Sequence, residues 1–210
     1  MNAADRSGFL RSISCRMVPH SGYRAETDTS RVSQIGLRVG MQFRSTSSRW
    51  GLVASTLHWL MALAIVAMLV LGVVMINYPM STIKLKLFAL HKSIGVTLLL
   101  LVWVRLVWRY FDRRPGWPEE LSGAHKQAAR GAHLLLYVLM VLVPLSGWFI
   151  NAASGFPLNW FGLFAVPSLL APNETLQVIA ETVHLTAVVT LAVILLLHVA
   201  GALHQQFARR

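Results

Sequence analysis

The chain has 210 residues, of which 55% are hydrophobic and 13% are charged, and its formal net charge is +11. The charged share is about half of that in an ordinary soluble domain. So apolar a chain is not disordered throughout, because disorder requires low hydrophobicity. Cys15 is the only cysteine, which excludes a scaffold held by disulfides. The length suits one domain or one small helical bundle.

The first 48 residues are rich in Arg and Ser, contain no Lys and have no long apolar run. We expect residues 1–48 to form a disordered basic extension, although a transit peptide has a similar composition. A third interpretation, which we favour, is that translation starts at Met41, which opens a short basic lead into the first apolar segment. Mass spectrometry of the native N-terminus tests this start, and a peptide from residues 1–40 would contradict it.

Four apolar segments follow the extension. The stretch Trp50 to Ile83 has no Asp, Glu, Lys or Arg, and its part Leu57 to Ile76 is 20 residues long. That length crosses about 30 Å of hydrocarbon at about 1.5 Å per residue. A soluble all-α protein is the alternative, but one soluble core of this size does not need four such runs. The sequence therefore predicts an all-α integral membrane four-helix bundle over residues 49–210, with helices at roughly 55–77, 88–110, 131–151 and 182–204.

The basic residues are distributed unevenly among the loops. Sixteen of the 19 lie before the first helix, around the second connection or at the C-terminus, and only Lys84, Lys86 and Lys92 lie on the other side. Because cytoplasmic loops carry the excess of Lys and Arg, both termini are predicted to be cytoplasmic. Nucleic-acid binding is not expected, since no folded basic face with stacking aromatics is evident.

Six of the eight histidines lie in or beside the apolar segments: His58, His91, His133, His184, His198 and His204. Polar residues at such positions are costly and usually functional. Helix order places His58 and His198 at one depth, and His91 and His184 at another. His184 and His198 are fourteen residues apart, which is about 1400° of rotation and about 21 Å of rise. Both side chains should therefore point into the bundle from one face, one near each membrane surface.

Two histidine pairs stacked across a bilayer favour two b-type haems. Such a haem takes two axial imidazoles from opposite helices, and six-coordinate iron transfers electrons instead of binding oxygen. No C-x-x-C-H motif is present, so attachment is expected to be non-covalent. Gly72, Gly95 and Gly147 are small residues placed to let a ring approach the helix backbones.

Two further polar residues lie near the expected cytoplasmic haem. Arg105 shares a helix face with His91 but lies fourteen residues further on, so it could neutralise a haem propionate, and a membrane anchor is the alternative. His133 competes as a third ligand at that depth, or could bind a propionate or a quinone.

The ordered motifs resemble the bacterial cytochrome b561 family of four-helix di-haem membrane proteins over about four-fifths of the chain. The matching pieces are RWGLVASTLHWLMA, LHKSIGVTLLLLVWVRLVWR, AHLLLYVLMVLVPLSGW, SGFPLNWFGLFAVP and ETVHLTAVVTLAVILLLHVAGALHQQF. The resemblance implies that His58, His91, His184 and His198 are the axial ligands of the haem irons, paired His58 with His198 and His91 with His184. It leaves His133 as a non-ligand.

The resemblance also implies a function in the bacterial inner membrane, which is electron exchange between the quinone pool and a donor or acceptor on the outer side. Ubiquinone or another quinone would be the substrate, and some family members are similar to a superoxide:ubiquinone oxidoreductase. The three outer lysines could attract a small anion such as superoxide, although lysines also flank membrane helices for other reasons. An anchor subunit for a separate dehydrogenase or hydrogenase is an alternative. A histidine-dependent proton or metal-ion transporter is an alternative of another class.

The third connection, Asn151 to Glu181, contains four aromatic residues and three prolines. Aromatic side chains favour the headgroup level. We expect a short amphipathic element that lies along the outer surface and caps the outer haem.

Overall fold

The computed structural model describes residues 42–47, 49–113, 115–116, 122–168 and 170–207. The expectations for residues 1–41, including the start at Met41, lie outside these ranges. Four long helices make up most of the described chain: α2 (Leu52–Asn77), α3 (Thr82–Phe111), α4 (Gly123–Ala153) and α5 (Glu174–Phe207). All four are long and apolar enough to cross a membrane, which confirms the predicted four-helix membrane protein.

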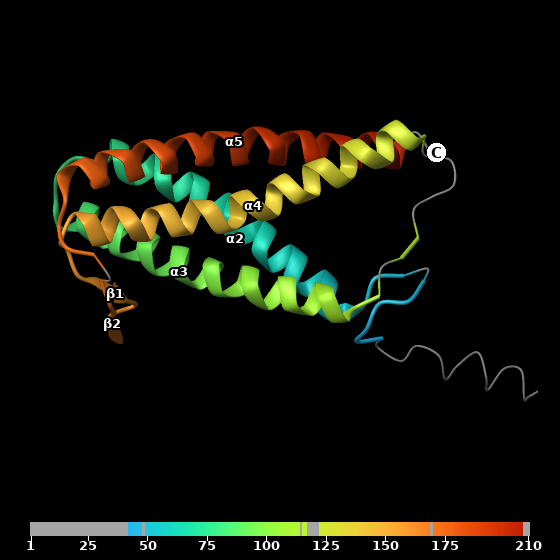
Figure 1. The fold of residues 1–210 in the computed structure, drawn as a ribbon, viewed down its shortest axis with the longest axis horizontal. Helices are drawn as coiled ribbons and strands as arrows, with labels where there is room; N and C mark the ends of the chain where they lie inside the picture. The colour runs from blue at the N-terminus through green and yellow to red at the C-terminus, as the bar shows by residue number, and fades with distance from the viewer. Residues whose placement is uncertain (1–41, 48, 114, 117–121, 169, 208–210) are drawn as a thin grey trace, which may run out of the picture. The chain divides into compact units, whose positions relative to one another are not determined.

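The helices form an antiparallel bundle in which α2 begins and α5 ends at the same end (Figure 1). The most extensive packing is between α4 and α5, followed by α2 on α3 and α3 on α4. Large apolar side chains point outward, such as Trp59 at 65%, Leu63 at 69% and Leu196 at 71% exposure. An apolar surface of this kind is suited to lipid rather than to water.

Each helix extends beyond the apolar run that predicted it. Ser81 and Ser122 accept hydrogen bonds at their side chains from the backbone N–H groups of Lys84 and His125, and so cap α3 and α4. Asn173 caps α5 in the same way, through the N–H of Leu176 at 2.9 Å. Capping side chains satisfy backbone donors that have no partner within the helix. The helices therefore begin at their caps and continue past the hydrocarbon-crossing segment.

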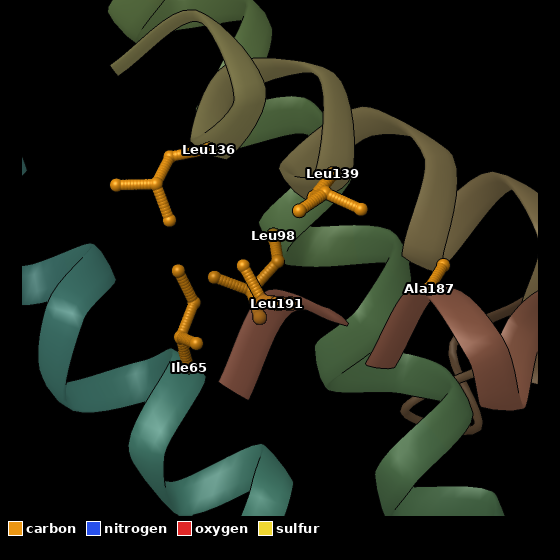
Figure 2. Close-up of a cluster of buried hydrophobic side chains, with 6 residues drawn as sticks. All are labelled: Ile65, Leu98, Leu136, Leu139, Ala187 and Leu191. Atoms are coloured by element: carbon orange, nitrogen blue, oxygen red, sulfur yellow. The ribbon is translucent and has the colours of Figure 1, made fainter. Parts of the chain in front are cut away.

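The buried core is a small apolar cluster to which all four helices contribute (Figure 2). Its members, which we call the apolar core cluster, are Ile65, Leu98, Leu136, Leu139, Ala187 and Leu191. Leu191 lies seven residues from both His184 and His198, which is about 10 Å of helix rise in each direction. The cluster thus separates the two depths at which the histidines lie.

The third connection forms a β-hairpin, a more specific structure than the amphipathic element we expected. Strand β1 (Leu158–Trp160) pairs antiparallel with β2 (Phe164–Val166). The Ser93 hydroxyl on α3 accepts from the N–H of Phe161 at 3.0 Å, and Trp160 Nε1 donates to Thr97 Oγ1 at 3.1 Å. Phe161 has a φ of 49°, a left-handed conformation that is unusual for a bulky residue. The hydrogen bond that Phe161 donates to Ser93 holds the turn of the hairpin in this strained conformation.

The segment before α2 is fastened to the end of α3. Asp112 accepts from the Ser45 N–H at 2.9 Å and from its hydroxyl, and the same hydroxyl accepts from the Gly51 N–H at 2.9 Å. A Cβ at Gly51 would come within 2.5 Å of the Arg44 backbone, so only glycine fits there. Residues 42–47, which we expected to belong to the extension, are thus joined to the helical unit.

Candidate haem sites

The structure brings His91 of α3 and His184 of α5 together at one end of the bundle. Their ring centroids are 6.5 Å apart. Two glycines lie against these rings, because a Cβ at Gly147 would be 3.3 Å from His184 Cε1 and one at Gly72 would be 3.7 Å from His91 Cε1. Gly72 and Gly147 therefore leave room for the two histidine rings. Gly95 does not, since it faces Met68 on α2.

The orientation of the His184 ring is fixed by α4. Its Nδ1 lies 2.9 Å from the Val143 carbonyl oxygen and 3.1 Å from Ser146 Oγ. A carbonyl can only accept, so Nδ1 carries the proton and donates to it. Nε2 is then left with a free lone pair, the arrangement usual for a metal-binding histidine. Pro144 lies within α4 beside this contact, and the helix changes direction along its length in Figure 1.

His91 is held differently from its partner. Its Nδ1 is buried and has no hydrogen-bond partner among the residues that the structure describes. Buried polar groups in proteins nearly always have a partner, so this nitrogen is an exception. Among the described residues, no hydrogen bond fixes the His91 ring as the Val143 carbonyl fixes the His184 ring.

The structure brings His58 of α2 and His198 of α5 together at the opposite end of the bundle. Their ring centroids are 6.4 Å apart. His133 of α4 also reaches this site, with its ring centroid 5.3 Å from that of His198. All four expected ligands thus occur in the expected pairs, and His133 lies beside the His58–His198 pair.

Two arginines and a tyrosine complete the His58 end of the bundle. Arg105 Nη2 lies 3.0 Å from His58 Nδ1, and Arg105 Nε donates to the Tyr137 hydroxyl at 3.1 Å. Arg109 also donates to the Tyr137 hydroxyl, at 3.3 Å, and its guanidinium lies over the Tyr137 ring. Arg105 was a sequence candidate, whereas Arg109 and Tyr137 were not. The sequence signal for Arg109 was its spacing from Arg105, which places both on one face of α3.

A cavity of about 920 Å³ opens at this end and is bordered by His58, His133, His198, Arg105, Arg109 and Tyr137. Cofactor pockets typically enclose about 300–1,000 Å³. Trp108 also lines the cavity, and its Nε1 is buried with no hydrogen-bond partner among the described residues. The charged donors that the cavity offers are the guanidinium groups of Arg105 and Arg109, which suit a ligand that carries acceptor oxygens.

The spacing of both histidine pairs fits one metal ion held between two imidazoles. With metal–nitrogen bonds of about 2.0 Å, ring centroids on opposite sides of the ion are about 6.3 Å apart. The two pairs have 6.4 and 6.5 Å, whereas His133 and His198 have 5.3 Å, which is too short.

A bare metal ion fits these pairs poorly. Among the described residues, no group of three or more His, Cys, Asp or Glu has the geometry of a metal site. Each pair offers two nitrogens, so the remaining ligands would have to come from a macrocycle. Haem supplies four such nitrogens and leaves two axial positions, which matches the ligands present.

Comparison with known proteins supports the same class. Residues 49–210 match the family described as prokaryotic cytochrome b561. Over 168 residues the chain is 33% identical to the protein named cytochrome b561 homolog 2 of Escherichia coli (strain K12). This match spans 80% of the chain and 89% of that protein.

The four spanning helices and these matches define a multi-pass protein of the bacterial inner membrane. Within that class, the chain belongs to the prokaryotic cytochrome b561 family. Members of this family bind haem b and transfer electrons across the membrane, so transmembrane electron transfer is the function of this chain.

Proposed function

We propose that the chain holds two haem b groups, one between His58 and His198 and one between His91 and His184. The observation that carries the proposal is that both pairs have the centroid spacing of a bis-imidazole site. Haem b, when bound, would supply a one-electron iron couple, and the histidines of each pair would hold it and suit it to electron transfer. Helix α5 contributes one ligand to each pair and so sets the distance between them, which is about 21 Å of rise.

Other residues of the chain would orient and neutralise the bound groups. The Val143 carbonyl holds the His184 ring with its Nε2 free. At the other end, Arg105 and Arg109 present guanidinium groups that suit propionate carboxylates, since charge-assisted bonds between these groups are strong. His133 lies beside this site as a further hydrogen-bonding group and not as a ligand.

We further propose that the His58 end faces the cytoplasm and exchanges electrons with ubiquinone or another quinone. The excess of basic residues at this end supports the orientation. His133 borders the cavity, its ring can donate a hydrogen bond, and a quinone carbonyl is an acceptor. His133→Ala is then expected to raise the KM for a short-chain quinone while both haems are retained. An unchanged KM would place the quinone elsewhere.

Superoxide is a second candidate for the partner on the outer side. Lys86 and Lys92 lie on α3 on either side of the outer ligand His91, and cationic side chains raise the encounter rate of small anions. Lys84 has a different role, because its Nζ donates a hydrogen bond to the Tyr78 carbonyl oxygen at 2.8 Å, just after the end of α2. The double variant Lys86→Gln, Lys92→Gln is expected to slow haem reduction by superoxide and to weaken its salt dependence. Lys126→Gln, at the other end of the bundle, is the control.

Haem content tests the central proposal directly. Purified protein should show a reducible b-type absorption spectrum and two haems per chain by the pyridine haemochrome assay. His184→Ala and His198→Ala should each leave one haem, whereas His204→Ala, at an exposed position on α5, should keep both. Colourless protein would favour the transporter alternative, and one haem in the unchanged chain would contradict the pairing. Co-purification of a soluble redox subunit would favour the anchor alternative.

A further inference from the structure

The β-hairpin between α4 and α5 has an exposed apolar surface. Residues 155–167, which include both strands, carry no charge, and Asn159 supplies their only polar side chain apart from the indole N–H of Trp160. Four of their large apolar side chains are between 50 and 73% exposed: Phe156, Phe161, Leu163 and Phe164. A two-stranded hairpin is at best marginally stable in water, and an exposed patch of this kind marks an interaction site. The hairpin surface therefore needs an apolar partner.

The hairpin lies on the flank of α3 and not beyond the end of the bundle (Figure 1). Its contacts are with Ser93 and Thr97, eleven and fifteen residues after the start of α3. These separations correspond to about 16 and 22 Å of helix rise. The first turns of α3, with Lys84 and Lys86, therefore extend past the level of the hairpin. The hairpin is thus beside the apolar part of the helix.

The surface of α3 around this contact is also apolar and exposed. Leu90 lies three residues before the Ser93 contact, and it is 43% exposed. Leu100 lies three residues after the Thr97 contact, and it is 57% exposed. Each leucine is therefore about 60° around the helix from the hairpin, on a surface that meets lipid in a spanning helix. Lys92, next to Ser93, can extend its charge to nearby headgroups.

The backbone of the hairpin is satisfied on the side that faces α3. The Ser93 hydroxyl accepts from the Phe161 N–H and lies 3.3 Å from the Asn159 carbonyl oxygen. Within the turn, the Leu163 N–H donates to the Trp160 carbonyl oxygen at 2.9 Å. Non-helical backbone is tolerated at membrane depth where protein groups satisfy it in this way. The outer edge of β2 pairs with no further strand in the described part of the chain, so its polar groups need headgroups or water.

We propose that the hairpin dips into the lipid leaflet at the His91 end of the bundle. Phe161, Leu163 and Phe164 then lie among the acyl chains nearest the headgroups, and the outer edge of β2 lies at the headgroups themselves. A soluble protein is disfavoured as the partner, because protein-binding surfaces have a polar rim and charges that orient the partner. Lipid is favoured over a second copy of the chain, because the hairpin adjoins the lipid-facing surface of α3. The inference depends on the spanning helices and not on the proposed haems.

Spin labels at single cysteines measure the depth of the hairpin. Cys15→Ser removes the native thiol, and Leu163→Cys places a label at the tip. Leu196→Cys, at an exposed position on α5, is the control for acyl chains, and Glu174→Cys, at the exposed start of α5, is the control for water.

Each variant is placed, one chain per disc, in nanodiscs of dioleoylphosphatidylcholine. Relaxation of the label by oxygen, which concentrates in the bilayer, is compared with relaxation by a water-soluble nickel complex. Both are measured relative to a sample that contains neither, so that any contribution from haem iron cancels.

The Leu163→Cys label is expected to relax several-fold more with oxygen than with the nickel complex, although by a smaller ratio than the Leu196→Cys label. The Glu174→Cys label should show the reverse. Stronger relaxation by the nickel complex at the tip would place it in water and overturn the proposal. Weak relaxation by both agents would mean that protein covers the tip, and a ratio as large as that of Leu196→Cys would place the tip deep in the bilayer; either result would also overturn it. Phe164→Cys repeats the measurement on β2, and size-exclusion elution checks that each variant is folded.

Ser93→Ala tests the part of the argument that concerns the backbone. Without the hydroxyl, the Phe161 N–H has no partner on α3, so the tip should move toward the headgroups and the oxygen preference of the Leu163→Cys label should fall. Thr190→Ala is the matched control, because the Thr190 hydroxyl donates within its own helix, to the Thr186 carbonyl oxygen at 2.8 Å. An equal oxygen preference in both variants would contradict the role of Ser93 in holding the hairpin at this depth.

Discussion

Arg105 donates a hydrogen bond from Nη2 to Nδ1 of His58 over 3.0 Å. A guanidinium has no acceptor, so Nδ1 must accept and the ring proton must lie on Nε2. A histidine that binds iron through Nε2 needs the opposite tautomer, with Nδ1 donating. His184 already has that tautomer through the Val143 carbonyl. The two sites thus differ, since His184 already has the tautomer of an iron ligand, whereas His58 gains it only when Arg105 moves.

Arg105 is expected to leave His58 for a haem propionate, where its charge would stabilise the reduced group. Arg105→Leu should lower the midpoint potential of one haem by tens of millivolts, because one charge at about 8 Å in a partly buried site contributes on the order of 2 kcal/mol. Arg105→Lys keeps the charge and should recover most of the shift. Optical redox titration measures both. Equal potentials in Arg105→Leu and the unchanged chain would show that the side chain is only an anchor.

His133 is expected to be dispensable for haem binding. Its centroid distance of 5.3 Å to His198 is shorter than a bis-imidazole site requires. His133→Ala should therefore retain two haems per chain, with altered quinone kinetics or potential at the His58 site. A variant with one haem would instead make His133 a ligand in place of His58, and His58→Ala would then retain both haems.

Gly147 is expected to be essential for the His91–His184 site. A Cβ there would lie 3.3 Å from the His184 ring, and the two methyl groups of valine would press further on it. Gly147→Val should therefore reduce haem content from two towards one per chain. Gly201→Val is the control, because nothing lies within 4 Å of a Cβ at Gly201 on α5. Equal haem loss in both variants would indicate general helix damage.

The contact of Ser45 with Asp112 is expected to depend on pH. Burial raises the pKa of the Asp112 carboxyl, but the hydroxyl and N–H of Ser45, the N–H of Arg113 and the charge of Arg44 outweigh it and lower this pKa below its usual value. Because the pKa is lower in the folded state, the contact contributes its full stabilisation of the fold at pH values above the unfolded-state pKa of about 3.9. The stabilisation is lost as the pH falls from there through the folded pKa.

Hydrogen exchange at Gly51 reports this contact, since its N–H donates to Ser45 Oγ. Ser45→Ala should speed exchange at Gly51 about fivefold at neutral pH, from the loss of about 1 kcal/mol. Ser47→Ala should have no effect, because Ser47 holds Gly116 through its carbonyl. After correction for intrinsic rates, the protection of Gly51 should also fall below about pH 4 in the unchanged chain. Constant protection across that range would contradict a role for the Asp112 charge.

The sequence predicted the helices from their hydropathy, and the depths of the histidines from the order of the helices. Hydropathy marks the part of each helix in hydrocarbon, and the spacing of His184 and His198 along one helix requires a shared face. The ends of the helices were underestimated, since they depend on caps such as Ser81 and Ser122. The hydropathy pattern does not show these ends, because a capping serine is not an apolar residue.

The hairpin and the polar contacts between helices could not be predicted from the sequence. Trp160 meets Thr97 across 63 residues, and Arg105 meets His58 across 47, so each depends on how whole helices pack. Asn151 is similar, because its Nδ2 donates to the Phe156 carbonyl oxygen beyond the end of α4. Such contacts depend on tertiary packing, and local composition does not indicate them.

The apolar core cluster has a consequence for the energetics of the membrane. Its six side chains come from all four helices and present no polar atom between the two histidine levels. Electrons can tunnel through such a layer, but a proton would need a chain of water or polar groups to follow. Protons taken up or released in the redox reaction must then enter and leave on the side where the chemistry occurs. Each electron that crosses would move one uncompensated charge, worth about 2.3 kcal/mol per 100 mV of membrane potential, so turnover would respond to the voltage across the cell membrane.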